Sequence, residues 1–184
     1  MKTFSTSSRL IAACLMSLAM MIGALPHETA AAPVTYTFTG AIGEVSFPLY
    51  TSQGTGSDGF NTGLTLSGKF EFNPLAVPTS LTSTVATYSN AVTRLSFNIG
   101  TYASPDALGG GLMGVNQIKV TNGSTDAYQV AASALGPLVK NLAPSIFEID
   151  LQDGGGTAFT SLALPGAPAP ALSAFNINRW RLIF

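Results

Sequence analysis

Residues 32–184 of this chain contain no histidine and no cysteine, because the only histidine, His27, and the only cysteine, Cys14, come earlier. Without imidazole or thiolate, these residues cannot build a Ser-His-Asp or Cys-His catalytic system, a zinc site of histidine or cysteine ligands, the usual haem ligation or a disulfide. We therefore expect a protein that has no cofactor and is not an enzyme.

Charge is also scarce. Charged residues make up 9% of the chain, and the formal net charge is −1. Beyond residue 31 the charged side chains stand singly, so sequence neighbours cannot form a basic groove for nucleic acid or a polybasic patch for anionic lipid. We expect neither nucleic acid nor a membrane surface as a partner.

The first 31 residues have the order of a secretory signal peptide. A short region with Lys2 and Arg9 but no acid precedes an apolar run from Leu10 to Leu25. That run is shorter than the roughly 20 residues that a membrane-spanning helix needs, and no basic flank of a stop-transfer anchor follows it. We expect cleavage and secretion with no stable membrane anchor, and a retained anchor is the alternative.

Alternating hydrophobicity dominates the remainder. Residues 64–72 read Leu-Thr-Leu-Ser-Gly-Lys-Phe-Glu-Phe, with an apolar residue or glycine at every second position. This period of two predicts a strand with one buried and one wet face, on which Leu66, Phe70 and Phe72 share the buried side. Further strands are expected over residues 34–39, 92–99, 115–120, 127–132, 146–151 and 175–184.

No segment beyond residue 31 keeps a helical period, because glycine and proline interrupt the two candidates, residues 131–143 and 164–170. About seven strands separated by turn-forming sequences favour an all-β fold, an antiparallel two-sheet β-sandwich. We therefore expect one β-sandwich domain over residues 32–184, preceded by the cleaved signal peptide at residues 1–31.

Asn122-Gly123 is the strongest hairpin signal in the chain, since alternating segments flank it on both sides. This dipeptide favours a two-residue type I′ turn, whose central residues both need positive φ. We expect residues 115–121 to pair with 125–131, with Thr121 facing Ser124.

Glu148 and Asp150 are the two candidate catalytic acids. Glu148 and Asp150 lie two residues apart and so share one face of their expected strand. A glycosidase needs two carboxyl groups that flank a bond and have separated pKa values, whereas these two share an environment. We interpret them as a solvated face. A calcium site drawn from these two with Asp126 and Asp153 is an alternative, although none of them matches a known calcium loop.

Residues 109–114 read Gly-Gly-Gly-Leu-Met-Gly and satisfy the G-x-G-x-x-G spacing of dinucleotide-binding proteins. In those proteins the glycines open a helix whose N-terminus holds a pyrophosphate, whereas here a strand-like segment follows. We interpret the run as a flexible loop.

Three aromatic residues fall in glycine-rich segments outside the main strands: Tyr50, Phe60 and Tyr102. Exposed loop aromatics can stack on sugar rings, so these three are the candidate glycan-binding residues. The alternative is that a loop of this kind tucks an aromatic inward as a plug.

Several short segments follow one another in a fixed order: Tyr36–Gly40, Leu66–Pro74, Tyr88, Leu95–Asn98, Asp126–Val130, Phe147–Asp153, Gly156–Ser161, Leu164-Pro165 and Phe175. Together with the signal peptide, this order resembles exported β-sandwich proteins that carry the PEP-CTERM sorting signal in exopolysaccharide-making Gram-negative bacteria. The resemblance covers nearly all of residues 32–184 and rests on strand and turn patterns without a catalytic residue. It implies a protein of the cell surface or the exopolysaccharide matrix.

The end of the chain departs from that family, whose members continue with a Val-Pro-Glu-Pro signal, an apolar helix and a basic tail. This chain stops at Phe184 within a strand pattern, so we expect either a truncated member or one released without sorting. In that pattern Trp180, Leu182 and Phe184 should face the core, while Arg179 and Arg181 face water. An uncovered edge at this strand would favour self-association.

The leading hypothesis is a secreted, non-catalytic structural or interaction protein of the cell surface or exopolysaccharide matrix. Its partners would be extracellular polysaccharide or surface proteins. A carbohydrate-binding β-sandwich module is the first alternative, and a glycan-acting hydrolase that uses carboxylates alone is the second.

The signal peptide makes a direct prediction. Thr29 and Ala31 place small side chains at the −3 and −1 positions of signal peptidase, so the mature protein should begin at Ala32. N-terminal sequencing of the secreted protein should give Ala-Pro-Val-Thr, and a secreted chain that still carries residues 1–31 would contradict the prediction.

Overall fold

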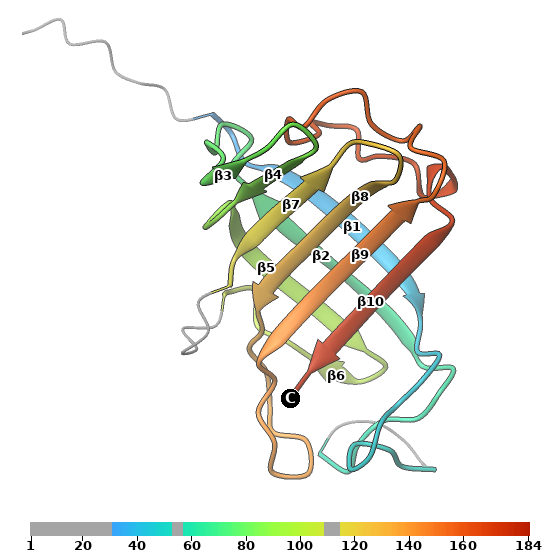
Figure 1. The fold of residues 1–184 in the computed structure, drawn as a ribbon. Helices are drawn as coiled ribbons and strands as arrows, with labels where there is room; N and C mark the ends of the chain where they lie inside the picture. Colours follow the sequence, from blue (N-terminus) through green and yellow to red (C-terminus); the bar gives the residue numbers. More distant parts are fainter. Residues whose placement is uncertain (1–30, 53–56, 109–114) are drawn as a thin grey trace, which may run out of the picture. The chain divides into compact units, whose positions relative to one another are not determined.

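In the computed structural model, described over residues 31–52, 57–108 and 115–184, the alternating segments form the strands of two antiparallel sheets (Figure 1). Residues 1–30 of the predicted signal peptide and the glycine run at 109–114 lie outside the described residues. The strands are β1 (Val34–Ala41), β2 (Thr65–Phe72), β3 (Ser80–Leu81), β4 (Val85–Tyr88), β5 (Val92–Ile99), β6 (Tyr102–Ala103), β7 (Gln117–Thr121), β8 (Asp126–Ser133), β9 (Ile146–Asp153) and β10 (Ile177–Ile183).

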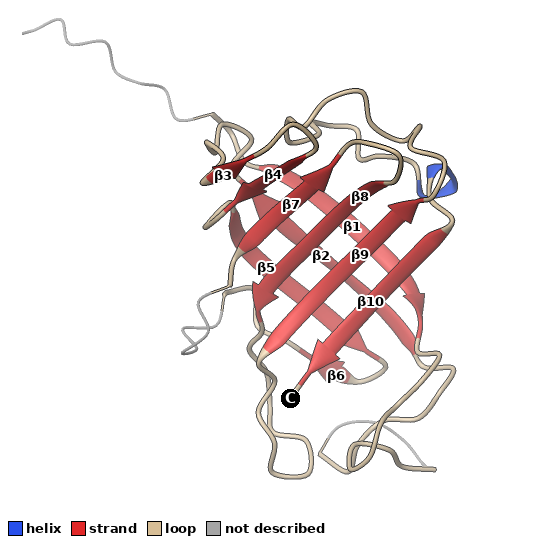
Figure 2. Ribbon diagram, in the orientation of Figure 1, coloured by secondary structure: helices blue, strands red, loops and turns tan. Residues whose placement is uncertain are grey.

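Four strands make one sheet, in the order β1-β2-β5-β6, and six make the other, in the order β10-β9-β8-β7-β4-β3. Figure 2 shows one sheet lying over the other, with the long strands of the two sheets running across one another. This arrangement confirms the predicted all-β, two-sheet antiparallel sandwich. In the described parts of the chain no helix is long and apolar enough to cross a membrane, and one short 3₁₀ turn, η1 (Leu172–Ala174), precedes β10.

The long strands follow the predicted segments to within a few residues, whereas β3, β4 and β6 were not predicted. These three strands contain two, four and two residues. A period of two cannot be recognised over so few positions, so only pairing with a longer neighbour identifies them.

The hairpin prediction is correct in its pairing and wrong in its turn. β7 pairs with β8, but Thr121 lies opposite Ala127 and not opposite Ser124. Neither Asn122 nor Gly123 has the positive φ that a type I′ turn requires. The backbone N–H of Asn122 donates to Thr84 O at 2.9 Å, and that of Gly123 donates to the Asp126 carboxylate at 3.0 Å. These two hydrogen bonds favour a wider loop over the two-residue turn.

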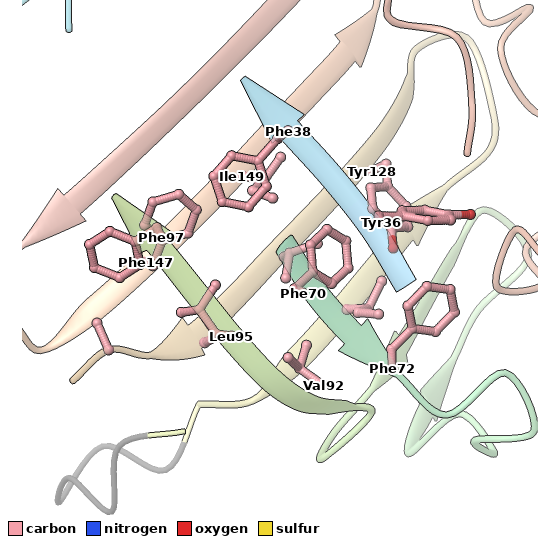
Figure 3. Close-up of a cluster of buried hydrophobic side chains, with 14 of the residues drawn as sticks. Tyr36, Phe38, Phe70, Phe72, Val92, Leu95, Phe97, Tyr128, Phe147 and Ile149 are labelled. Carbon is pink, nitrogen blue, oxygen red and sulfur yellow. The ribbon is translucent and has the colours of Figure 1, made fainter. Parts of the chain in front are cut away.

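The core joins the two sheets through stacked phenylalanine rings (Figure 3). Phe147 of β9 lies between Phe38 of β1, at a centroid distance of 5.2 Å, and Phe97 of β5, at 4.9 Å. The three rings, which we call the phenylalanine stack, are at most 9% exposed. Stacked aromatic pairs at these separations stabilise a core beyond the area that they bury.

Gly68 of β2 makes room for the phenylalanine stack. The strand register places it directly between Phe38 and Phe97 on the same face of the four-stranded sheet. A Cβ built at Gly68 would overlap the ring of Phe38 and the carbonyl oxygen of Ser96. On either side of this gap, the predicted buried residues Leu66, Phe70 and Phe72 are at most 4% exposed, which confirms the predicted face of β2.

β10 also alternates as predicted, although its inward face is only partly covered. Trp180, Leu182 and Phe184 are partly buried and pack against the core, while Arg179 and Arg181 are exposed. β10 pairs with β9 along its whole length and forms one edge of the six-stranded sheet. The arginines therefore project from the outer face of this sheet, beside the side chains of β9.

The gap at Gly68 can be tested by adding one methyl group. Gly68→Ala should lower the free energy of unfolding by about 1–3 kcal/mol, because the methyl group forces the phenylalanine stack or the backbone to move. The matched control is Gly40→Ala in β1, where nothing lies within 4 Å of an added Cβ. That variant should be neutral or up to about 1 kcal/mol more stable. Urea denaturation measures both, and equal stability of the two variants would contradict the packing described here.

Candidate functional site

The three predicted sugar-stacking residues do not form a site. Phe60 and Tyr102 are 4% and 3% exposed and meet edge to face at a centroid distance of 5.4 Å. The Tyr102 hydroxyl donates to Pro137 O at 3.2 Å, and burial raises the pKa of Tyr102 to about 12. These two rings close one end of the core and present no face to a ligand, so the prediction is wrong for both. Tyr50 alone is exposed, at 53%.

Asp126 and Asp153, named in the calcium alternative, hold loops in place. Asp126 is fully buried and accepts hydrogen bonds from the backbone N–H groups of Gly123 and Phe159, at 3.0 and 2.7 Å. Asp153 accepts from the backbone of Gly155 and from the backbone and hydroxyl of Thr157. The Thr157 and Gly155 backbone hydrogen bonds lower the pKa of Asp153. Across the described ranges, no group of three or more acidic, histidine or cysteine side chains is placed to hold a metal ion.

An apolar hollow of about 80 Å³ lies between β1 and β10. Tyr36, Phe38, Tyr128 and Trp180 contribute to its lining. Tyr128 Oη and Trp180 Nε1 have no hydrogen-bond partner among the described residues, but both atoms are closed off from solvent. Neither is therefore available to orient a ligand from the hollow.

A group of polar side chains lies on the outer face of the six-stranded sheet. Alternation along β7, β8, β9 and β10 turns their apolar residues into the core and their polar residues outward. We call this surface the polar face; its residues are Gln117, Lys119, Gln129, Ala131, Glu148, Asp150, Gln152, Arg179 and Arg181.

Strand register arranges most of the polar face in two rows. The first row crosses the sheet as Arg181, Glu148, Ala131 and Gln117. The second row crosses it as Arg179, Asp150, Gln129 and Lys119. Side chains directly opposite on adjacent strands lie close enough to interact, and each row has an acid beside an arginine at the β10 edge.

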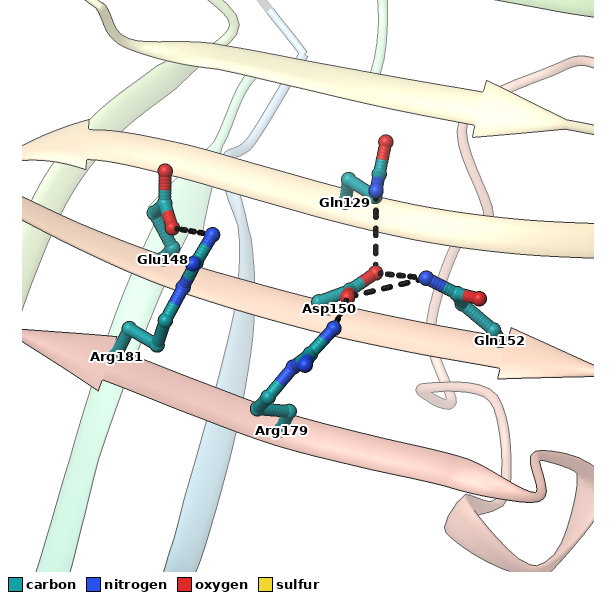
Figure 4. Close-up of polar contacts among 6 residues, drawn as sticks. All are labelled: Gln129, Glu148, Asp150, Gln152, Arg179 and Arg181. Atoms are coloured by element: carbon teal, nitrogen blue, oxygen red, sulfur yellow. Dashed lines mark hydrogen bonds and ion pairs between the residues drawn. The ribbon is translucent and has the colours of Figure 1, made fainter. Parts of the chain in front are cut away.

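Asp150 is the hub of the second row (Figure 4). Its carboxylate accepts hydrogen bonds from Arg179 Nη2 at 2.7 Å, from Gln129 Nε2 at 3.1 Å and from Gln152 Nε2 at 3.0 Å. Partial burial acts to raise the pKa of Asp150, but these hydrogen bonds and the charge of Arg179 outweigh it and hold the pKa below its ordinary value. Asp150 is therefore ionised at neutral pH, with its donors in place.

Glu148 also has an arginine partner, since Arg181 Nη2 lies 2.5 Å from its Oε2 (Figure 4), but unlike Asp150 it accepts no side-chain hydrogen bond among the described residues. The carboxyl side chain is 25% exposed, against 59% for the arginine. Both acids that the sequence raised as catalytic candidates thus carry an arginine partner. A glycosidase general acid has to be protonated near neutral pH, which requires a raised pKa. For Asp150 the lowered pKa is the opposite of this requirement.

Ala131 opens a hollow in the polar face. Its neighbours in the two rows have long side chains, and its single methyl group leaves a solvent-open space of about 160 Å³. The polar side chains around this space are those of Gln117, Lys119, Gln129, Glu148, Asp150 and Arg181. We call it the Ala131 hollow.

Several side chains around the Ala131 hollow have donors or acceptors that they do not use in hydrogen bonds with other described residues. Among the described residues, no side-chain hydrogen bond or ion pair involves Gln117 or Lys119, and Gln129 uses only its Nε2. Glu148 and Asp150 balance Arg181 and Arg179, so Lys119 is the one charge of the polar face without an opposite partner. Amide, ammonium and carboxylate groups around an open hollow suit the binding of a small polar ligand.

The sequence indicated which side chains of β9 and β10 face outward, but not which residues they meet. Gln117, Lys119, Gln129 and Ala131 carried no signal beyond strand alternation. Their grouping depends on the register of four strands, which the alternation of any single strand leaves undetermined.

Because Asp150 is ion-paired in the folded protein, we predict that the folded protein loses stability at acidic pH. Since the pKa of Asp150 is lower in the folded than in the unfolded protein, its stabilising contribution is present above the unfolded pKa and is lost as the pH falls through the folded pKa. In denaturation experiments between about pH 6 and pH 2, the wild type should lose unfolding free energy more steeply than Asp150→Asn. Asp153 titrates in both proteins, so the difference isolates Asp150, and identical slopes would contradict the prediction.

Comparison with known protein families, curated proteins and solved structures finds no match to this chain in any of the three. The features of this chain that bear on its function are the polar face, the Ala131 hollow and the sequence pattern of the N-terminus.

Proposed function

We propose that this chain is a secreted, non-catalytic structural or interaction protein of the cell surface or exopolysaccharide matrix. The signal-peptide pattern of residues 1–31 supports export. The resemblance to exported β-sandwich proteins with a PEP-CTERM signal supports the matrix or the cell surface as its destination. The polar face supports a role in binding over one in catalysis.

The pairing of Glu148 and Asp150 with arginines is the observation that carries this proposal. Arg179 and Gln152 hold the Asp150 carboxylate ionised, and Arg181 lies 2.5 Å from Glu148. Hydrolysis of a glycosidic bond by two carboxyl groups requires one acid that keeps its proton and another that is free to attack or to activate water. Two acids paired with arginines, one of them also hydrogen-bonded to two glutamines, are instead suited to an organised contact surface.

A carbohydrate-binding module is the second candidate. The Ala131 hollow favours it, because sugars are recognised by closely spaced hydrogen-bond donors and acceptors, and Gln117, Gln129 and Glu148 supply both kinds. The residues that would contact a sugar are then those of the polar face. A hydrolase that uses carboxylates alone is less well supported, since both candidate acids of the polar face, Glu148 and Asp150, are paired with arginines.

The proposed function is tested by locating the protein and by measuring its effect on polysaccharide. In its native bacterial host, the protein should be recovered without residues 1–31 in the extracellular matrix fraction. The purified protein should then be incubated with polysaccharide isolated from that matrix. Size-exclusion chromatography should show that the chain length of the polysaccharide is unchanged.

Two results would contradict the proposal. One is recovery of the protein only from the cytoplasm. The other is shortening of the polysaccharide by the wild type but not by Asp150→Asn, which would identify an enzyme that uses this carboxylate.

A further inference from the structure

We propose that the Ala131 hollow binds an acidic sugar unit of a polysaccharide, with Lys119 pairing the sugar carboxylate and the neighbouring amides bonding its hydroxyl groups. This inference rests on the proposed interaction function and names the ligand class and the residues that would recognise it.

The position of the hollow fits a ligand that lies on the sheet. β7 and β8 pair with neighbours on both sides, so the backbone groups of Ala131 and Gln117 are occupied by the sheet itself. An extended peptide usually binds by adding a strand at a free edge, which this location does not provide. Recognition at the Ala131 hollow has to use side chains that project from the sheet.

The hydrogen-bonding groups fit a polyhydroxyl ligand. A primary amide offers two N–H donors and a carbonyl acceptor, so Gln117 and the free Oε1 of Gln129 supply both kinds of group across the Ala131 methyl. A sugar hydroxyl also donates and accepts, and adjacent hydroxyls on a ring require both kinds of partner close together. The Glu148 carboxylate extends this set with a further acceptor at the wall of the hollow.

The charge pattern selects an acidic unit over a neutral one. Arg179 and Arg181 are neutralised by Asp150 and Glu148, at 2.7 and 2.5 Å. Lys119 has no carboxylate within ion-pair distance among the described residues. One uncompensated ammonium group matches the single carboxylate of a uronic acid. It provides too little positive charge for a nucleic acid, which requires a run of basic contacts.

The test is isothermal titration of the full secreted protein with oligogalacturonides, and with neutral cello-oligosaccharides of the same length. The acidic sugar should bind at least about tenfold more tightly than the neutral one, because a hydrogen bond to a charged group contributes more than one between neutral groups. Equal affinity for the two sugars would overturn the role of Lys119, and no binding of the acidic sugar would overturn the site.

Three variants locate the site. Lys119→Met should weaken oligogalacturonide binding about tenfold and leave the neutral sugar unaffected. Ala131→Leu, which fills the hollow with an outward-facing side chain, should weaken binding of both sugars. Arg94→Met is the matched control, since it removes one positive charge from the exposed outer face of the other sheet and should change affinity less than about twofold. Circular dichroism and thermal unfolding establish that each variant is folded.

Other outcomes separate this inference from the proposed function. If Lys119→Met binds as well as the wild type, or if Arg94→Met loses as much affinity as Lys119→Met, the Ala131 hollow is not the site. Binding of an oligoglutamate peptide with the same affinity and the same dependence on Lys119 would overturn the assignment to sugars. None of these results affects recovery of the protein from the matrix fraction, which tests the proposed function independently.

Discussion

The phenylalanine stack is the contact on which the rest of the structure depends. Phe38 and Phe97 belong to one sheet and Phe147 to the other, so the stack joins the two sheets directly. The stack forms only because Gly68 leaves room for Phe38 within its own sheet. Close packing of this kind tolerates little change in volume, and a single methyl group at this position therefore matters more than most surface substitutions.

The same contact positions the polar face. Phe147 and Glu148 are neighbours on β9, so a ring held in the core sets where the next side chain leaves the outer surface. Through the register of β9 with β8 and β10, this placement carries over to Ala131 and Arg181. One face of β9 thus packs in the core and the other belongs to the proposed binding surface. A shift of its register by one residue would exchange the two faces.

Electrostatics then decide which chemistry the polar face supports. Four of its charges cancel in two arginine–carboxylate pairs along the β10 edge, and the Arg179 pair helps to hold Asp150 ionised. Lys119, two strands away from Asp150, is left without such a partner. Because both arginines are largely exposed, the pairs contribute only modestly to stability, and they also orient side chains around the Ala131 hollow.

The sequence alone determined the fold class, most strands and the direction of their faces, because strand alternation is a local property that needs no knowledge of neighbours. Leu66, Phe70, Phe72 and the alternation of Trp180 with its flanking arginines were all predicted correctly on that basis. The sequence could not determine that Phe60 and Tyr102 close an end of the core, or that Asp126 holds two loops, because those roles depend on distant segments. Only the tertiary structure decided the register that joins Gln117, Ala131, Glu148 and Arg181 in one row, since each strand pattern is compatible with several registers and packing across the whole sandwich selects among them.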